Sequence, residues 1–165
     1  MKLKEYTKSF IALIFSLSLH VHSNEYVEPC LPSSQFNLGG LAITDNYAAI
    51  EKKFGTPKSI GTYSATDDGG EYIGKSLEYD RTEIHFEKLR GIQLISTANP
   101  KIELKLGVRV GMNINEVSER LHFNTLKPTN IISLNVCGVT TDENLLKLYF
   151  SESVLNKIEI SSFGP

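Results

Sequence analysis

The chain has 165 residues, of which 17 are Lys or Arg and 19 are Asp or Glu, so its formal net charge at pH 7 is −2. This balance argues against the strongly basic surface typical of proteins that bind nucleic acid or an anionic membrane. Hydrophobic residues make up 41% of the chain. That content and this length are enough for one globular domain with its own core.

Residues 1–23 have the pattern of a secretory signal peptide. Three lysines precede the apolar run Phe10–Leu19, and a short polar stretch leads to Ser23, where cleavage is expected. An uncleaved anchor is the alternative, but the run is about half of the roughly 20 residues that span a bilayer. Cys30 does not follow the apolar run directly, as a lipidated cysteine would. We therefore expect a periplasmic or secreted protein with no membrane insertion after cleavage.

Cleavage after Ser23 would remove three Lys and one Glu, which changes the formal net charge from −2 to −4. A mildly acidic exported chain is not expected to bind nucleic acid. Residues 24–38 contain two prolines and no apolar period, so they are predicted to form an extended arm. Residues 39–165 are predicted to form a single domain.

The two cysteines, Cys30 and Cys137, permit one intramolecular disulfide in an oxidising compartment. Such a bond would tie the arm to the second half of the domain. The alternative is a reactive thiol, which would need a CxxC pair or a neighbouring basic cluster, and the sequence has neither.

The first half of the domain is predicted to begin with a helix over residues 46–54. Asn46 can cap this helix, and Gly55, with Pro57 just beyond it, ends it. Four β-prone runs follow, and their close spacing requires antiparallel neighbours. They are Lys58–Tyr63, Glu71–Tyr79, Thr82–Lys88 and Arg90–Thr97.

The second half has a similar order of elements. Asn113 and Glu116 form the capping-box pattern of a helix within Gly107–Leu121. Three β-prone runs follow at Asn130–Cys137, Leu145–Ser151 and Val154–Ser162.

The similar order of elements predicts an α+β fold of two tandem helix-plus-antiparallel-sheet repeats, residues 39–104 and 105–165. The repeats are expected to form one continuous sheet with both helices on one face. The predicted core consists of apolar residues at matching positions in the two halves. They are Ile50, Phe54, Ile84, Phe86, Ile92, Val117, Leu121, Leu148, Phe150, Ile158 and Ile160.

The pattern GVxxGMxxxEVxxxL at residues 107–121 and the FGTP sequence at residues 54–57 resemble two related families. These are the tandem-repeat β-lactamase inhibitory proteins and the smaller outer-membrane assembly lipoproteins. Both families act by binding protein surfaces, so the resemblance implies a binding module. The chain departs from them because it lacks a lipidated cysteine and has no Trp.

No catalytic or metal-binding signature is evident in the sequence. His85 and His122 lie in different halves of the mature chain, so no metal ligand cluster and no cofactor are expected. The acidic stretch Asp67–Glu71 lacks the alternating oxygen ligands of a calcium loop and is predicted to be a solvated turn. Glu78, Glu83 and Glu87 could supply the paired carboxylates of a hydrolase, but alternating charges on a strand more often form a solvated face.

The sequence instead points to a non-catalytic module that binds another protein in the bacterial envelope. An inhibitor or immunity-type protein is the leading hypothesis, and an envelope-assembly structural factor or a carboxylate-dependent hydrolase are the alternatives. Tyrosines at outward positions of strands supply amphipathic contact area for such binding, although each could simply fill space beside its cross-strand neighbour. The candidate binding residues are Tyr72, Glu78, Glu83, His85, Lys147 and Tyr149.

Overall fold

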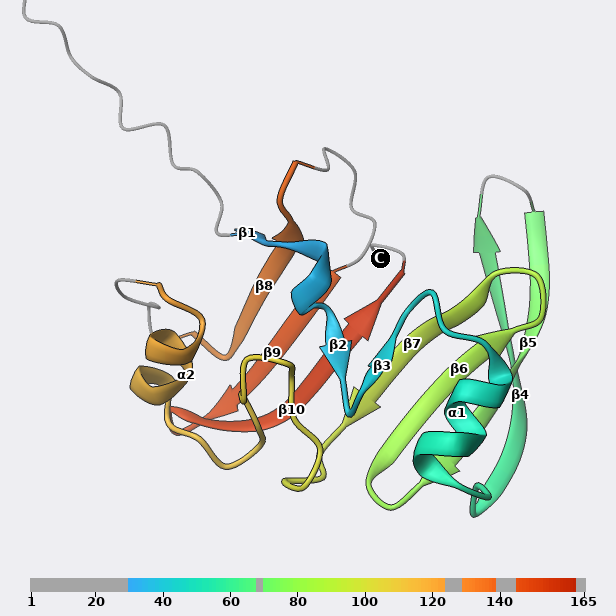
Figure 1. The fold of residues 1–165 in the computed structure, drawn as a ribbon, viewed down its shortest axis with the longest axis horizontal. Helices are drawn as coiled ribbons and strands as arrows, with labels where there is room; N and C mark the ends of the chain where they lie inside the picture. Colours follow the sequence, from blue (N-terminus) through green and yellow to red (C-terminus); the bar gives the residue numbers. More distant parts are fainter. Residues whose placement is uncertain (1–29, 68–69, 124–128, 139–144, 163–165) are drawn as a thin grey trace, which may run out of the picture.

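The computed structural model describes residues 30–67, 70–123, 129–138 and 145–162. The predicted signal peptide and the first part of the arm therefore lie outside the described residues. Strands make up 52% of the described structure and helical segments 15%. Figure 1 shows the result, a broad twisted sheet with two short helices beside it.

Eight strands form one mixed sheet in the order β1-β8-β9-β10-β7-β6-β5-β4. Strands β4 to β7 form an antiparallel meander, β8 to β10 form a second, and β10 pairs with β7 to join them. The strands are β1 (Cys30–Leu31), β4 (Ser59–Asp67), β5 (Gly70–Tyr79), β6 (Thr82–Glu87), β7 (Gly91–Thr97), β8 (Ile131–Val136), β9 (Leu145–Ser151) and β10 (Val154–Ser161). A separate two-stranded ribbon pairs β2 (Asn37–Leu38) with β3 (Leu41–Ala42).

The predicted fold class of two tandem helix-plus-sheet repeats over 39–104 and 105–165 is wrong. The structure is mostly sheet, and it is organised as one large mixed sheet with two helices, α1 (Tyr47–Phe54) and α2 (Ile114–Arg120). One strand of this sheet, β1, lies outside both predicted repeats and runs parallel to β8. The two halves share an Asn-capped helix and alternating strands, but these features did not identify repeated units. Short helices with similar N-caps arise from local backbone chemistry alone.

Both helices begin where the sequence places a capping residue. The side chain of Asn46 accepts a hydrogen bond from the N–H of Ala49 at the start of α1. At the start of α2, Asn113 and Glu116 form the predicted capping box. Gly55 ends α1 with φ 74°, a backbone conformation that glycine adopts without steric cost.

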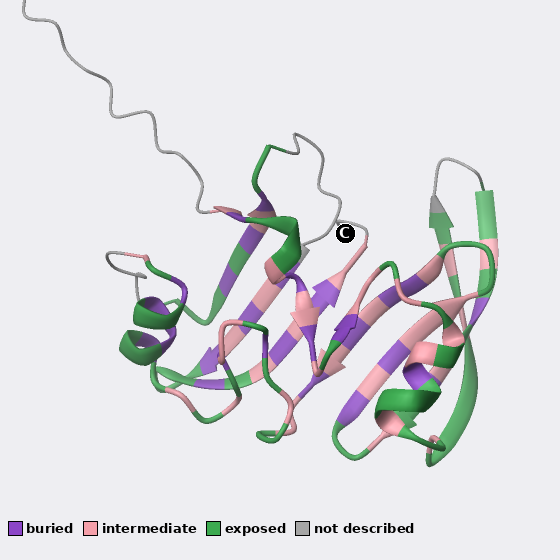
Figure 2. Ribbon diagram, in the orientation of Figure 1, coloured by how far each residue is buried: buried purple, intermediate pink, exposed green. Residues whose placement is uncertain are grey.

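The strand register separates two faces of the sheet, because successive side chains of a strand point to opposite sides. Figure 2 shows the alternation of buried and more exposed residues along the central strands. The helix-side face carries the core. Of the eleven predicted core residues, all are buried except Phe54 and Phe86, which are partly buried and pack against the core. We call the other side, which carries Tyr63, Ser76, His85, Lys147 and Tyr149, the open face.

The predicted disulfide between Cys30 and Cys137 is confirmed in the structure. It joins residues 107 positions apart whose Cα atoms are 4.9 Å from each other. A disulfide of this kind fits an oxidising compartment. Among the described residues, no helix has the length and apolar character that crossing a bilayer would require.

Candidate binding face

The six predicted binding residues all lie on the open face. Tyr72 and Glu78 come from β5, Glu83 and His85 from β6, and Lys147 and Tyr149 from β9. The register aligns Ser76 with His85, Glu78 with Glu83, and Lys147 with Glu159. The residues fall into two groups, because β7 and β10 lie between β6 and β9.

The first group is an aromatic cluster over β4, β5 and β6. The ring of Tyr63 stacks on the imidazole of His85 with the centroids 4.3 Å apart and the planes 16° from parallel. Tyr72 meets the edge of Tyr63 at 6.2 Å, and the guanidinium of Arg90 lies 4.1 Å above the ring of Tyr72. Three rings and one cation are therefore held in fixed mutual orientation by stacking and cation–π contact.

Gly74 explains why Tyr63 can lie flat in this cluster. Gly74 is the cross-strand neighbour of Tyr63, and a Cβ at that position would overlap the Tyr63 ring. Tyr63 is not among the residues predicted from the sequence. The signal was present in the glycine within a long predicted strand, since such a glycine often marks the close approach of another group.

The Tyr63 hydroxyl is buried and accepts or donates no hydrogen bond among the described residues. Burial is the main cause that raises the pKa of Tyr63 from 10.0 to about 12, and the charges of Tyr72 and Glu87 act in the same direction. Burial also raises the pKa of Tyr72. Both rings are therefore neutral at physiological pH and present apolar faces.

Glu83 organises the polar part of the same cluster. Its Oε1 lies 2.7 Å from His85 Nε2 and accepts a hydrogen bond from Ser76 Oγ at 2.8 Å. The bond with His85 is the main cause that lowers the pKa of Glu83. The carboxylate of Glu83 therefore lies between the Ser76 hydroxyl and the His85 imidazole. The imidazole does not contact this serine as the base of a catalytic triad would.

Glu78 and Glu83, the carboxylate pair proposed for a hydrolase, each have a hydrogen-bond partner in the sheet. Glu78 and Glu83 are cross-strand neighbours, but Glu78 accepts a 2.5 Å hydrogen bond from Ser59 and Glu83 is bonded as described above. A general acid needs a raised pKa, whereas the pKa of Glu83 is lowered. No group of three or more potential ligands within the described ranges is placed to hold a metal ion.

The second group lies on β9 and β10. Lys157 Nζ is 3.9 Å from the ring centroid of Tyr149 and 2.9 Å from Glu159 Oε2. The Tyr149 hydroxyl donates to Glu159 Oε1 at 3.3 Å. Burial tends to lower the pKa of Lys157, but the hydrogen bond and charge of Glu159 outweigh it and raise that pKa. Lys157 and Glu159 are not among the residues predicted from the sequence, although they alternate with the predicted core residues Ile158 and Ile160 of β10.

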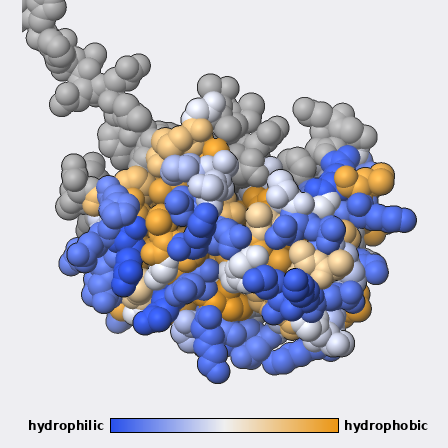
Figure 3. Space-filling model, viewed as in Figure 1, coloured by the Kyte–Doolittle hydropathy of each residue, from blue (hydrophilic) through white to orange (hydrophobic). Residues whose placement is uncertain are grey.

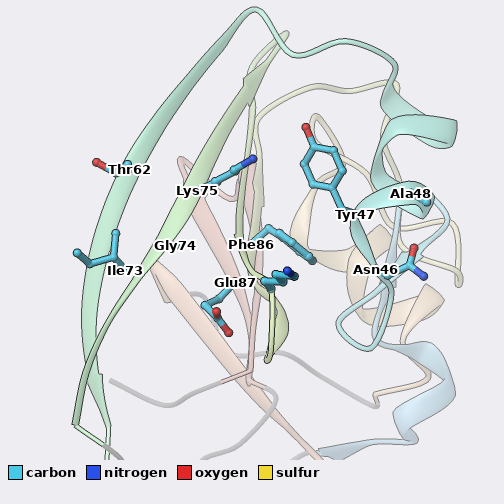
Figure 4. A pocket seen from close by; sticks show the side chains of 10 residues that line it. Asn46, Tyr47, Ala48, Thr62, Ile73, Gly74, Lys75, Phe86 and Glu87 are labelled. Carbon is cyan, nitrogen blue, oxygen red and sulfur yellow. The ribbon is translucent and has the colours of Figure 1, made fainter.

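A groove of about 630 Å³ lies on the opposite, helix-side face, away from the predicted residues. Figure 4 shows Tyr47 and Asn46 of the α1 region on one side of it and Thr62 and Ile73 of the strands on the other. Lys75 reaches across from β5, with its Nζ 5.3 Å from the centroid of the Tyr47 ring. On the surface drawn in Figure 3, hydrophilic and hydrophobic residues are interspersed.

No protein-family model matches this chain, and no curated protein matches it significantly. Among solved structures, the chain is similar to an extracellular protein containing an SCP domain from Bacillus anthracis, with 15% identity and a TM-score of 0.46. That match covers 73% of this chain and 44% of the other. It is also similar to the uncharacterized protein yfeY from Escherichia coli, with 11% identity, a TM-score of 0.44, and coverage of 79% and 99%.

Proposed function

We propose that this protein is an exported, non-catalytic module that binds another protein of the cell envelope through its open face. The observation that carries this proposal is the cluster of Tyr63, His85, Tyr72 and Arg90. Tyrosine and arginine dominate the energetic centres of protein interfaces. Side chains that are already held by mutual stacking also lose less conformational entropy when a partner orders them.

The second group extends the same face toward the other end of the sheet. Tyr149 and Lys157 add one more ring-and-cation pair, and Lys147 adds a partly buried cation above β9. Mixed charge at these positions favours a partner surface that is polar and carries acidic as well as basic side chains. The surface of another protein can have this chemistry, and an inhibitor or immunity-type protein would act by covering such a surface.

The partner is expected to share the compartment of this chain. The signal-peptide pattern of residues 1–23 directs export, and the Cys30–Cys137 disulfide is stable where thiols are oxidised. Periplasmic and secreted destinations both meet this condition.

An affinity pull-down from envelope extract tests the proposal. The wild-type chain is immobilised beside a variant that combines Tyr72→Ala, His85→Ala and Tyr149→Ala. We expect the wild type to retain a defined partner and the variant to lose most of it, because the three truncations remove two rings of the first group and the Tyr149 ring of the second.

A matched control separates loss of binding from loss of folding. Lys52→Ala, Arg109→Ala and Glu119→Ala combined change three exposed residues outside the open face. This control should capture the partner as the wild type does. If the open-face variant is folded by circular dichroism and captures the same partner undiminished, the open face is not the binding site.

A further inference from the structure

Among the described residues, β4 forms one edge of the sheet and has no strand paired with its outer side. β4 is the last strand in the sheet order and pairs with β5 over nine residue pairs without any register shift. Between Ser59 and Thr66 it contains no charged residue and no proline. Proteins usually protect such edges with charges, prolines, bulges or short strands. The other edge strand, β1, is only two residues long and is tied down by the disulfide.

Exposed apolar side chains lie beside this edge on the helix-side face. Ile60 of β4 is 57% exposed and Ile73 of β5 is 69% exposed. The two isoleucines lie four residue pairs apart along the β4–β5 ladder, because Ile60 is aligned with Leu77 and Ile73 with Ser64. The outward N–H and C=O groups of β4 and this apolar surface together form a site to which another strand can pair.

We propose that the strand that covers it is β4 of a second copy of this chain. The two β4 strands run antiparallel about a two-fold axis at Thr62, so that the two sheets become one. A two-fold axis perpendicular to the sheet keeps each face continuous and brings the same surface of both copies together. Residues that face each other then have position numbers that differ by an even number and point to the same side.

This register pairs the exposed isoleucines reciprocally. Ile60 faces the partner's Ser64, which is itself aligned with the partner's Ile73. The small serine lets the two isoleucine side chains approach each other above it. The two-fold axis repeats this contact, so all four exposed isoleucines are covered.

The same register is complementary in charge. Lys58 faces the partner's Thr66, which is aligned with the partner's Glu71. Lys58 is exposed and has one described partner, Asp80, at 3.3 Å. An antiparallel copy therefore places a lysine and a glutamate in one row at both ends of the interface, whereas a parallel copy would place lysine beside lysine.

The open face supplies a third match. Gly61 faces the partner's Tyr63, whose ring already lies over its own Gly74. Each Tyr63 is thus flanked by a glycine on the neighbouring strand at either side, which leaves room for its ring. A register centred on Tyr63 would instead set the two Tyr63 rings against each other and would align Ile60 with the row of Glu71.

Light scattering coupled to size exclusion tests the proposal on the exported chain. We expect a concentration-dependent shift toward twice the mass of one chain. Ile60→Lys with Ile73→Lys should weaken the dimer by at least about tenfold, because lysines at an edge oppose strand addition. The matched control Ile131→Lys, at a 50% exposed position of β8, should dimerise as the wild type does.

Cysteine crosslinking tests the register even if the lysine variants fold poorly. Thr62→Cys should form an intermolecular disulfide, because the two Thr62 residues face each other. Ser59→Cys should not, since the two Ser59 residues would be about 20 Å apart along the strands. A monomer at every concentration, or equal crosslinking of both variants, overturns the proposal. If the chain is a monomer and an added Val-Thr repeat peptide slows hydrogen exchange of the β4 amides, the edge binds extended peptides instead. That result overturns the dimer proposal as well.

Discussion

The contact between Tyr63, Gly74 and His85 is the point at which single residues control the candidate binding face. The Tyr63 ring lies over Gly74 in a space that no side chain occupies, and the same ring supports the imidazole of His85. A residue with a Cβ at position 74 would displace the ring. The orientation of His85 therefore depends on a glycine that has no functional group.

Gly74→Ala is predicted to destabilise the fold by about 1–3 kcal/mol, the usual cost of forcing an added methyl into a packed site. Chemical denaturation of dilute protein measures this change. Gly61→Ala is the matched control in the neighbouring strand, because a Cβ there meets only ordinary contacts with Ser76. It should cost less than about 0.5 kcal/mol. Equal effects for the two substitutions would contradict the close packing of Tyr63 on Gly74.

Glu83 gives the stability of the fold a defined acid dependence. Its pKa is lowered from 4.5 in the folded chain, mainly by the hydrogen bond with His85. The folded state therefore binds this proton less readily than the unfolded state. The resulting stabilisation is complete above pH 4.5 and is lost as the pH falls through the lower, folded pKa.

Glu83→Gln is predicted to flatten the decline of the unfolding free energy below pH 4.5, since glutamine does not titrate. Urea denaturation at a series of acid pH values measures the slope. Glu119→Gln changes a carboxylate on the exposed side of α2 and serves as the control. A wild-type slope identical to that of Glu83→Gln would show that the folded chain does not depress the pKa of Glu83.

At the scale of elements, α2 depends on Asn113, the N-cap residue that precedes the helix. With only seven residues, the helix leaves most of its N–H groups near an end. The Asn113 side chain accepts hydrogen bonds from the N–H groups of Asn115 and Glu116, and Glu116 bonds back to the Asn113 N–H. These bonds satisfy groups that a helix this short would otherwise leave to water.

Asn113→Ala is predicted to lower the free energy of unfolding by about 1 kcal/mol, the usual cost of losing an N-cap. Thermal and urea denaturation measure this loss. Asn115→Ala removes an exposed asparagine from the first turn and should have a near-zero or stabilising effect, because alanine has the higher helix propensity. Reversal of this order would contradict the capping role of Asn113.

The elements that the sequence predicted are those with strong local signals. Caps at Asn46 and Asn113 located both helices, and alternation of apolar residues located β5, β6, β9 and β10. The two-residue strands β1, β2 and β3 were missed because two residues carry no period. The tandem-repeat interpretation failed because pairing across the sheet depends on distant segments, and β1 joins β8 through contacts that no local pattern records.

The candidate site was predicted in the same partial way. The six residues selected from strand alternation all lie on the open face of the sheet. Tyr63 and Arg90 were missed because their contacts depend on the register of β4 against β5 and on the turn after β6. Stacking geometry is a tertiary property, so the sequence could indicate the face but not the cluster.

At the scale of the whole molecule, the disulfide fastens one end of the sheet. It joins β1 to the residue that follows β8, so a strand of only two residues stays paired. Cys30→Ser with Cys137→Ser is predicted to lower the unfolding free energy by up to about 4–5 kcal/mol in the chain-entropy model. Urea denaturation measures the loss. Alkylation followed by mass spectrometry should find no reactive thiol in the unreduced wild type, and two such thiols would contradict the bond.

The pairing of β1 with β8 also sets an order of events during biosynthesis. The ribosome makes Cys30 first, and 107 further positions must follow before Cys137 exists. The β4 to β7 meander needs only short hairpins and can form earlier, whereas contacts between distant segments form slowly. Strand β1 therefore cannot pair until β8 has been synthesised. Until Cys137 has been made, Cys30 has no partner within the chain, and its correct bond competes with bonds to every other thiol it meets.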